Sequence, residues 1–253
     1  MATPRFASLI LYEDEDYLVV NKPPLLATLT ERNSATPYLL QLAQAYHPAA
    51  QVAHRLDKTT SGALALAKHP AAYQALCQQF EARTVAKTYH TVLTGHHHFQ
   101  GHAVQAPLSI TRYHRAKVDP RHGKQATTIF TTLQNFAGYT LVHCQPITGR
   151  LHQIRIHAAY LQAPIVGDTQ YGGQQLYLST LKRHYHLRQS TKERPLAARV
   201  ALHAYQLAFT GLQGQAIVVQ APYAADFTTL LKQLTRYASP APQMQSHPSS
   251  TIA

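Results

Sequence analysis

Short apolar segments that occur in pairs, each pair joined by a polar or glycine-rich turn, constrain the fold of this chain most. Segments of this length, rich in β-branched and aromatic residues, predict antiparallel hairpins. Their pairing argues against a doubly wound parallel sheet. The predicted pairs are residues 9–12 with 17–22, residues 126–134 with 138–145, and residues 201–210 with 215–221.

Helical segments are interspersed with these hairpins. Thr36 and Pro37 are suitable residues for an N-cap and a first helical turn, so they predict a helix over residues 36–46. Residues 63–67 and 87–93 predict further strands. The other helices are expected at residues 70–82, 155–161 and 224–237. The sequence therefore predicts an α+β fold, with a mainly antiparallel mixed sheet and flanking helices.

The length of 253 residues suits one large domain or two small ones. We expect one domain over residues 1–237, divided into two subdomains around a central cleft. Residues 238–253 contain Pro, Ser and Gln with few apolar anchors, and they predict a disordered tail. Inside the domain, residues 94–125 are the least regular part and predict a mobile functional loop.

Positive charge dominates the composition, with 23 Lys and Arg against 11 Asp and Glu and a formal net charge of +12. Such an excess indicates a polyanionic partner. Nucleic acid is the first candidate and an anionic membrane the second. The alternative is a basic surface without a specific partner. The 15 Tyr and 7 Phe residues supply rings for base stacking, although most are expected in the core.

Cys77 and Cys144 belong to no Cys-x-x-Cys pair, so they predict reduced thiols rather than a disulfide framework. No apolar run approaches the roughly 18 to 20 residues that span a bilayer. Residues 1–6 lack the apolar stretch of a signal peptide. We therefore expect a cytoplasmic location. The sequence contains no Gly-x-Gly-x-x-Gly motif and no Walker loop, so a nucleotide cofactor is not indicated.

Asp57 is the acidic residue whose setting most suggests chemistry. It lies within His54–Gly62, two positions after Arg55, and it is separate from the acidic cluster at residues 13–16. Apolar residues flank this segment on both sides. A carboxylate in such a setting is either a structural ion-pair partner or a reactive group.

A second basic segment, residues 148–157, contains Arg150, His152 and Arg155. At the start of a helix, His152 and Arg155 would share a face. An arginine there could bind a phosphate or a buried carboxylate, whereas a solvated basic helix face is the alternative. A third segment surrounds Asp168, which has the pattern of a turn or cap aspartate.

Two other chemistries are compatible with these residues. His54, His152, His157 and Asp168 permit a zinc site, but no His-Glu-x-x-His motif is present, and 17 His residues make chance proximity common. A glycosidase-like pair of Asp57 and Asp168 is the second hypothesis. The turn-like setting of Asp168 and the absence of tryptophan as a sugar platform argue against it.

Five short motifs occur in order along the chain, at Val19–Pro23, His54–Gly62, Gly149–His157, Pro164–Gly172 and Leu202–Ala204. They match the patterns VVNKP, HRLDxxTSG, GRxHQIRxH, PIxGDxxYG and LHA. In this order the motifs resemble those of one family, the RluA-type pseudouridine synthases. Residues 24–26 depart from the small-Gly-apolar turn of the family, and residues 94–125 match no family motif. The ordered set extends over most of residues 9–221.

The resemblance implies an isomerase that converts uridine to pseudouridine within an RNA chain, with neither cofactor nor metal ion. By similarity, Asp57 is the catalytic carboxylate, which either attacks the ribose C1′ or abstracts a neighbouring proton as uracil leaves. Arg155 would pair with Asp57. Tyr89 would stack on the everted base and help remove the C5 proton, and a core strand tyrosine is the alternative for it. Arg55 would hold the RNA open.

RNA binding must offset the cost of extracting a base, a few kcal/mol, of which stacking on one ring returns about 1 to 3 kcal/mol. The expected RNA-binding residues are Arg55, Arg150, His152, Arg112, Arg115, Lys117, Arg121 and Lys124. Solvated charge is the alternative for the last five. We expect structured RNA as the substrate, ribosomal RNA first and transfer RNA second, no membrane partner, and a monomer. A non-catalytic RNA-binding protein on the same scaffold is the alternative function.

Overall fold

The computed structural model describes residues 4–30, 36–111, 115–186 and 192–239. Its α-helices are α1 (Leu39–Tyr46), α2 (Pro70–Glu81), α3 (Gln153–Tyr160), α4 (Leu178–Leu181) and α5 (Ala225–Tyr237). Its strands are β1 (Ile10–Glu13), β2 (Tyr17–Lys22), β3 (Ser61–Ala67), β4 (Ala86–Thr94), β5 (His102–Gln105), β6 (Leu108–Ile110), β7 (Ala116–Val118), β8 (Thr127–Phe136), β9 (Tyr139–Pro146), β10 (Leu202–Thr210) and β11 (Ala216–Gln220). In these ranges, no helix has the length and apolar character needed to cross a membrane.

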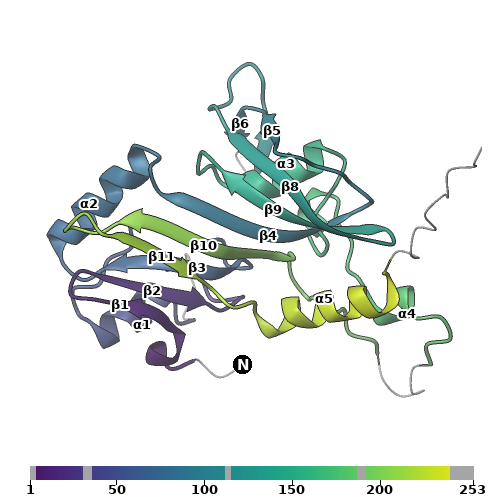
Figure 1. The fold of residues 1–253 in the computed structure, drawn as a ribbon, viewed down its shortest axis with the longest axis horizontal. Helices are drawn as coiled ribbons and strands as arrows, with labels where there is room; N and C mark the ends of the chain where they lie inside the picture. The colour runs from purple at the N-terminus through teal and green to yellow at the C-terminus, as the bar shows by residue number, and fades with distance from the viewer. Residues whose placement is uncertain (1–3, 31–35, 112–114, 187–191, 240–253) are drawn as a thin grey trace, which may run out of the picture.

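One mixed sheet runs through the molecule (Figure 1) in the order β1-β2-β3-β10-β4-β9-β8-β5, and β11 pairs with β10 beside this path. Its neighbouring strands are antiparallel except β3 and β10, which are parallel. The predicted hairpins are β1–β2, β8–β9 and β10–β11. The α+β class with a mainly antiparallel sheet and flanking helices is confirmed.

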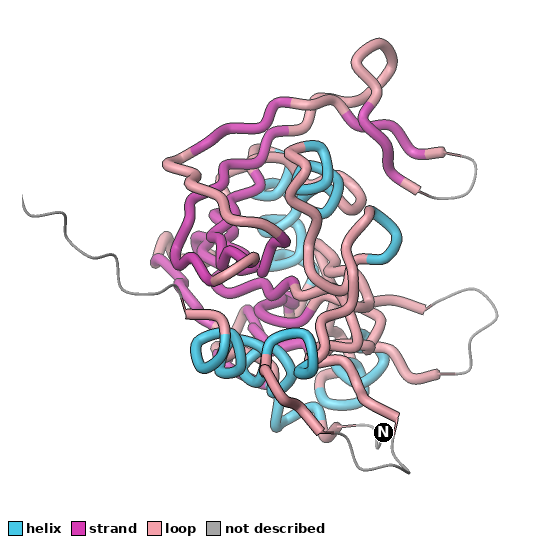
Figure 2. The backbone as a smooth tube through the Cα atoms, turned by 90° about the vertical axis from the view of Figure 1, so that its right-hand side faces the viewer, coloured by secondary structure: helices cyan, strands magenta, loops and turns pink. Residues whose placement is uncertain are grey.

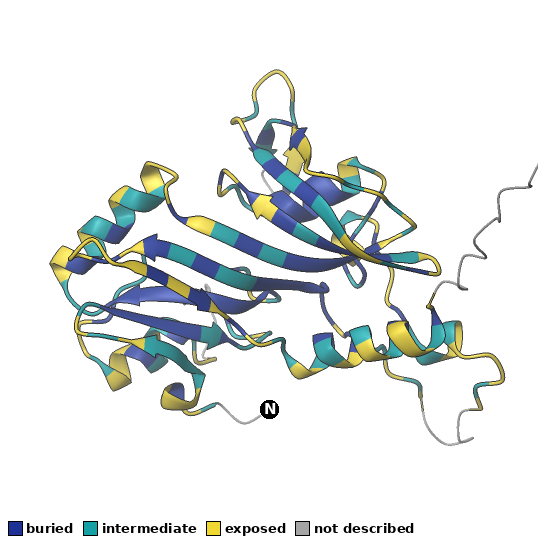
Figure 3. Cartoon of the chain, viewed as in Figure 1, coloured by how far each residue is buried: buried dark blue, intermediate teal, exposed yellow. Residues whose placement is uncertain are grey.

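The strand β3 is buried over its whole length because helices cover both of its faces. Ala65 packs in a core cluster with Leu76 of α2. Leu64 packs on the other face in a cluster with Leu39 and Ala43 of α1. Figure 3 shows this central part of the sheet as its most buried part. The residues that lead into β3 are therefore attached to a fully buried strand of the core.

The first helix begins later than its sequence suggests. Thr36 is the expected N-cap, but α1 starts at Leu39, and Tyr38 occupies the cap position without a side-chain hydrogen bond to the helix. The amides of Leu39 and Leu40 donate instead to the carbonyls of Ala27 and Thr28, at 2.8 and 3.1 Å. A distant backbone segment thus satisfies the free helix amides that a polar cap would otherwise bind.

The prediction of an irregular loop over residues 94–125 is wrong where the structure describes that segment. Strand β5 pairs with the edge of the large sheet, and β6 and β7 form a separate hairpin, which lies at the periphery of the molecule (Figure 2). Leu108 and Ala116 of the hairpin pack with Ile156 of α3. These strands bury too few side chains for their alternation to stand out against the basic residues around them.

The C-terminal boundary differs slightly from the expected one. Ala238, expected in the disordered tail, is buried in the core cluster that contains Phe227 and Leu234 of α5, and its carbonyl accepts a hydrogen bond from the Ala137 amide. Residues 240–253 lie outside the described residues. The division of residues 1–237 into two subdomains stays a prediction.

A glycine and a buried arginine join β3 to β10. Gly62 has φ +115°, and a Cβ atom there would meet the Ala204 carbonyl oxygen at 2.2 Å, so the close approach of the strands requires glycine.

Arg199 is buried and forms a bidentate ion pair with Asp226 of α5, at 2.8 and 2.9 Å. It also donates to the Thr59 carbonyl and to Ser61 Oγ, at 2.9 and 3.0 Å. These contacts hold the loop that precedes β3 against the last helix.

A hydrogen-bonded chain continues from this arginine to His203. The ring Nδ1 lies 2.8 Å from Ser61 Oγ, and Nε2 lies 3.1 Å from the Ala221 carbonyl oxygen. A carbonyl can only accept, so Nε2 carries the proton and Nδ1 accepts from Ser61. Burial lowers the pKa of His203 to about 4, and the ring is therefore neutral at physiological pH.

We expect His203→Gln to weaken the acid sensitivity of the fold. The unfolded chain takes up a proton near pH 6.5 and the folded chain only near pH 4, so this group makes unfolding easier as pH falls between those values. Between these two pKa values, each such histidine lowers the free energy of unfolding by about 1 kcal/mol for each pH unit of acidification. Urea unfolding at several pH values between 7 and 4 gives the slope of the free energy of unfolding against pH. This slope should be smaller in His203→Gln than in wild type and unchanged in the exposed control His98→Gln. Equal slopes in all three proteins would contradict the prediction.

Candidate active site

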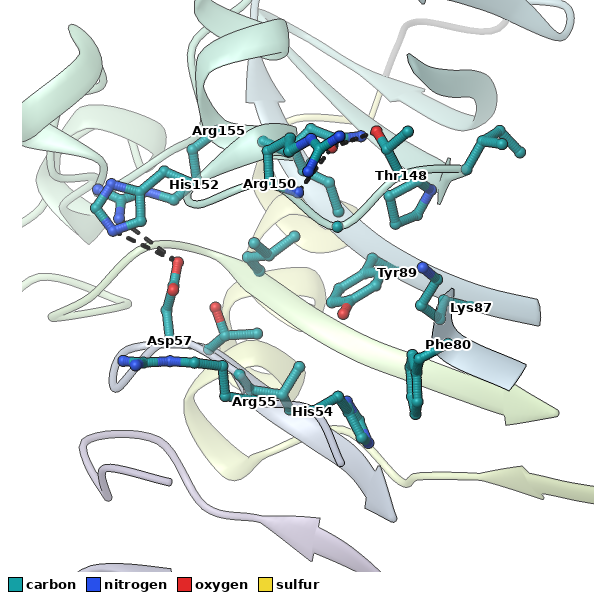
Figure 4. A pocket seen from close by; sticks show the side chains of 18 of the residues that line it. His54, Arg55, Asp57, Phe80, Lys87, Tyr89, Thr148, Arg150, His152 and Arg155 are labelled. Atoms are coloured by element: carbon teal, nitrogen blue, oxygen red, sulfur yellow. Dashed lines mark hydrogen bonds and ion pairs between the residues drawn. The ribbon is translucent and has the colours of Figure 1, made fainter. Parts of the chain in front are cut away.

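Asp57 lies on the loop that precedes β3, with its side chain 23% exposed. Its Oδ2 atom is 3.8 Å from Arg155 Nη1 and 3.7 Å from His152 Nε2, the contacts drawn as dashed lines in Figure 4. Arg55, its neighbour in sequence, is exposed and forms no ion pair with it in the described structure. The basic side chains that face this carboxylate therefore come from the residues around the start of α3.

The Asp57 loop is held from below by Lys22 at the end of β2. Lys22 is fully buried, and its ammonium donates to the carbonyls of Leu26, Pro23 and Lys58, at 2.8, 3.1 and 3.3 Å. Burial and, to a lesser extent, the charge of Arg199 lower the pKa of Lys22 to about 7, although the charge of Asp57 opposes this effect. In the sequence, Lys22 stands out only as part of the Val19–Pro23 motif, because a lysine bonded to carbonyls leaves no sequence signal of its own.

Arg155 has a stronger partner than the predicted one. Its guanidinium forms a two-pronged ion pair with Asp168, both distances being 2.7 Å, and both side chains are buried. Nη2 also donates to Gln170 Oε1 at 3.2 Å, and the guanidinium lies over the ring of Tyr171 at 4.9 Å. The pairing of Arg155 with Asp57 thus exists only as a longer contact. Asp168 orients the guanidinium so that one nitrogen remains to face Asp57.

His152 precedes α3 in a left-handed conformation, with φ 52°. Its Nδ1 lies 2.8 Å from the Tyr171 hydroxyl, and that hydroxyl accepts a hydrogen bond from the Ala116 amide of β7. The hydroxyl proton is then available to Nδ1, which leaves the His152 proton on Nε2 beside Asp57. Burial lowers the pKa of His152, although Asp57 opposes the effect. The His152 ring is therefore neutral, and its N–H faces the Asp57 carboxylate. Tyr171 connects this ring to the β6–β7 hairpin.

Tyr89, on β4, borders the same cavity as Asp57, which has a volume of about 460 Å³. The described structure contains no hydrogen bond to its hydroxyl group. Burial raises the pKa of Tyr89, and the charge of Asp57 raises it further. Tyr89 is therefore a protonated phenol at neutral pH. A cavity of this size is typical of small-molecule sites and accommodates a planar base against the ring.

The expected RNA-binding residues separate into two groups. Arg55, Arg150 and His152 line the cavity with Asp57. Arg115, Lys117, Arg121 and Lys124 are exposed on and beside the β6–β7 hairpin. Lys124 lines a neighbouring cavity of about 400 Å³ that also contains Arg150, and this links the hairpin to the site. Arg112 lies outside the described residues.

The two alternative chemistries find little support in the geometry. No group of three or more His, Cys, Asp or Glu side chains in the described ranges is arranged to hold a metal ion. Both ring nitrogens of His157 lie within hydrogen-bond distance of Thr128 and Ala106, at 2.9 and 3.0 Å. Asp168 is enclosed by its ion pair with Arg155, so it does not face a substrate as a second catalytic carboxylate would.

Comparisons with known proteins point to one family. The family model described as RNA pseudouridylate synthase matches residues 16–160 of the chain. Ribosomal large subunit pseudouridine synthase C of Vibrio cholerae is 38% identical over 168 residues, which are 64% of this chain and 52% of that protein. Ribosomal large subunit pseudouridine synthase D of Zymomonas mobilis is 34% identical over 242 residues, which are 89% of this chain and 72% of that protein.

A solved structure shows the same likeness in three dimensions. The structure titled human RNA pseudouridylate synthase domain containing 4 superposes with a TM-score of 0.71 at 27% identity. The match covers 91% of this chain and 95% of that one. The chain spans about half of the Vibrio relative and nearly three quarters of the Zymomonas relative.

Proposed function

Because this chain belongs to the family of RNA pseudouridylate synthases, we propose that it isomerises uridines of ribosomal RNA to pseudouridine, with Asp57 as the reacting carboxylate. The observation that carries the proposal is the setting of Asp57. It lies in a cavity bordered by Tyr89, with a nitrogen of the buried Arg155 at 3.8 Å. The names of the two bacterial relatives specify the large ribosomal subunit, and this favours ribosomal over transfer RNA.

The reaction moves a uracil from one attachment to another. The bond between uracil N1 and ribose C1′ breaks, the base turns, and C5 bonds to C1′ while the C5 proton is lost and N1 gains one. Asp57 either attacks C1′ or removes a neighbouring proton to release the base. In both routes the carboxylate must be ionised, and the guanidinium of Arg155 stabilises that charge.

We assign the remaining roles from position and protonation. The ring of Tyr89 stacks on the everted uracil, a contact worth about 1 to 3 kcal/mol. Its raised pKa leaves almost no phenolate to act as a base in the free protein, so the stacking role is the better supported one. Arg55 is exposed at the mouth of the cavity, where it can occupy the space that the uridine leaves in the RNA.

Tritium release tests the activity and the substrate together. Large-subunit ribosomal RNA and bulk transfer RNA, each labelled at uracil C5, are incubated separately with the protein. Release from the ribosomal RNA, with new pseudouridines at mapped positions, is the expected result. Release from transfer RNA alone would refute the choice of substrate. Absence of release from both would refute the activity and favour a non-catalytic RNA-binding protein.

We expect the basic residues on and beside the β6–β7 hairpin to determine RNA affinity and not the rate of turnover. Arg115, Lys117, Arg121 and Lys124 changed together to Gln should lower the slope of log affinity against log salt by roughly one for each phosphate that the variant no longer binds. Turnover at saturating RNA should not change, because none of the four lines the cavity with Asp57. A matched control neutralises Lys182, Arg183, Lys232 and Arg236, which are exposed around α4 and α5. Equal slopes in the two variants would contradict the prediction.

A further inference from the structure

The cavity that contains Asp57 has a second end that the proposed reaction does not use. In the view of Figure 4, Tyr89 lies between Asp57 on one side and Lys87 and Phe80 on the other. His54, Phe80, Arg83 and Lys87 all line this same cavity. They come from the end of α2, the start of β4 and the loop before β3.

Lys87 is a cation without a counterion. It is half-buried on β4, and no ion pair or hydrogen bond to its side chain occurs within the described part of the chain. Glu81 is the acid at this end of the cavity, but it is exposed and forms no ion pair with Lys87. Burial lowers the pKa of Lys87, and the nearby charge of Arg83 lowers it further. A partly desolvated ammonium is costly unless an anion completes its environment.

Arg83 brings a second positive charge to this end. It follows α2 in a left-handed conformation, with φ 60°, at a position where helices commonly carry glycine. Its side chain is exposed, and it has no carboxylate partner among the described residues. Two cations that repel each other therefore converge on the cavity.

An aromatic wall adjoins these cations. His54 Nε2 accepts a hydrogen bond from the Ala65 amide at 3.0 Å, so the ring proton is on Nδ1. Burial lowers the pKa of His54 to about 3, and the ring is neutral. It stacks on Phe80, with ring centroids 4.4 Å apart and an angle of 27° between the planes. A neutral aromatic pair beside two cations matches the ribose or base and the phosphate of a nucleotide.

We propose that this end of the cavity is a second nucleotide subsite, in which Lys87 and Arg83 bind the phosphodiester next to the everted uridine and the Phe80–His54 pair packs against the adjoining nucleoside. The subsite rests on the proposed function, because it requires an RNA strand that continues past a uridine held at Asp57. Its role is to bind the strand at one neighbour of the target, which strengthens RNA binding without taking part in the reaction at Asp57.

Variants of Lys87 test the subsite on an RNA fragment that contains a uridine modified by the wild-type protein. Lys87→Gln should raise KM about tenfold or more, as expected when one charge-assisted hydrogen bond is removed, with kcat nearly unchanged. Lys87→Arg should retain most of the affinity. The exposed Lys232→Gln is the control and should match wild type. Because Lys87 has no internal partner, Lys87→Met should unfold at a temperature no lower than wild type while binding RNA more weakly.

An uncharged linkage in the RNA backbone identifies the phosphate that Lys87 binds. A methylphosphonate placed on either side of the target uridine should weaken binding to wild type at one of the two positions. At that position it should weaken binding to Lys87→Gln no further, since the two changes remove the same interaction. Additive effects at both positions would overturn the subsite while leaving the proposed function intact. Absence of tritium release from any RNA would overturn both proposals.

Discussion

We expect Asp57→Asn to abolish pseudouridine formation while leaving the fold and RNA binding in place. The substitution keeps the shape of the side chain but removes the charge needed for attack or proton abstraction. We expect a loss of about 10⁴-fold in turnover, the upper end of what one such group contributes. The measurement is single-turnover tritium release from ribosomal RNA with enzyme in excess.

Stability and affinity controls separate this effect from misfolding. The Asp57 side chain is partly exposed and lies no closer than 3.7 Å to its basic neighbours, so its replacement should change stability by less than about 1 kcal/mol. RNA affinity should stay within a few-fold of wild type. A variant that keeps more than a tenth of the wild-type rate would show that another group performs the chemistry.

The second large effect is expected from Asp168→Asn, which should lower the stability of the fold. Asp168 is 1% exposed, and both of its oxygens are bound by Arg155. Removing its charge leaves the buried guanidinium with only the longer contact to Asp57, and breaking a buried ion pair in this way costs about 3 to 5 kcal/mol. Urea unfolding should show this decrease in stability. Turnover should fall as well, because the guanidinium that faces Asp57 is no longer held in place.

A double variant distinguishes the two consequences. Replacing the pair by apolar residues, Arg155→Met with Asp168→Leu, removes both buried charges, and such replacements are often neutral for stability. We expect this protein to be nearly as stable as wild type and to remain inactive. Wild-type stability in Asp168→Asn would show that the ion pair does not support the fold, and substantial turnover in the double variant would exclude a role for Arg155.

Sequence patterns predict more of the fold than of the contacts within the site. Alternation along β8 and β9 and the turn between β10 and β11 are local properties, and the predicted hairpins agree with the structure. The strands within residues 94–125 escape prediction because they are short and each of them buries only one side chain. The expected Thr36 cap is wrong because a distant backbone segment binds the helix amides instead.

In the site as well, features set by residues close together in sequence were predicted, whereas contacts between distant segments were not. The order and type of the secondary-structure elements, the basic charge and the motif positions of Asp57, Tyr89 and Arg155 were available from the chain alone, because each depends on residues that are near one another in sequence. Tertiary structure alone decided that the expected pairing of Arg155 with Asp57 is only a longer contact, that Asp168 holds that arginine, and that Lys22 and Arg199 support the loop. These contacts depend on β3 lying parallel to β10 and on where α3 begins, and only packing between distant segments sets either.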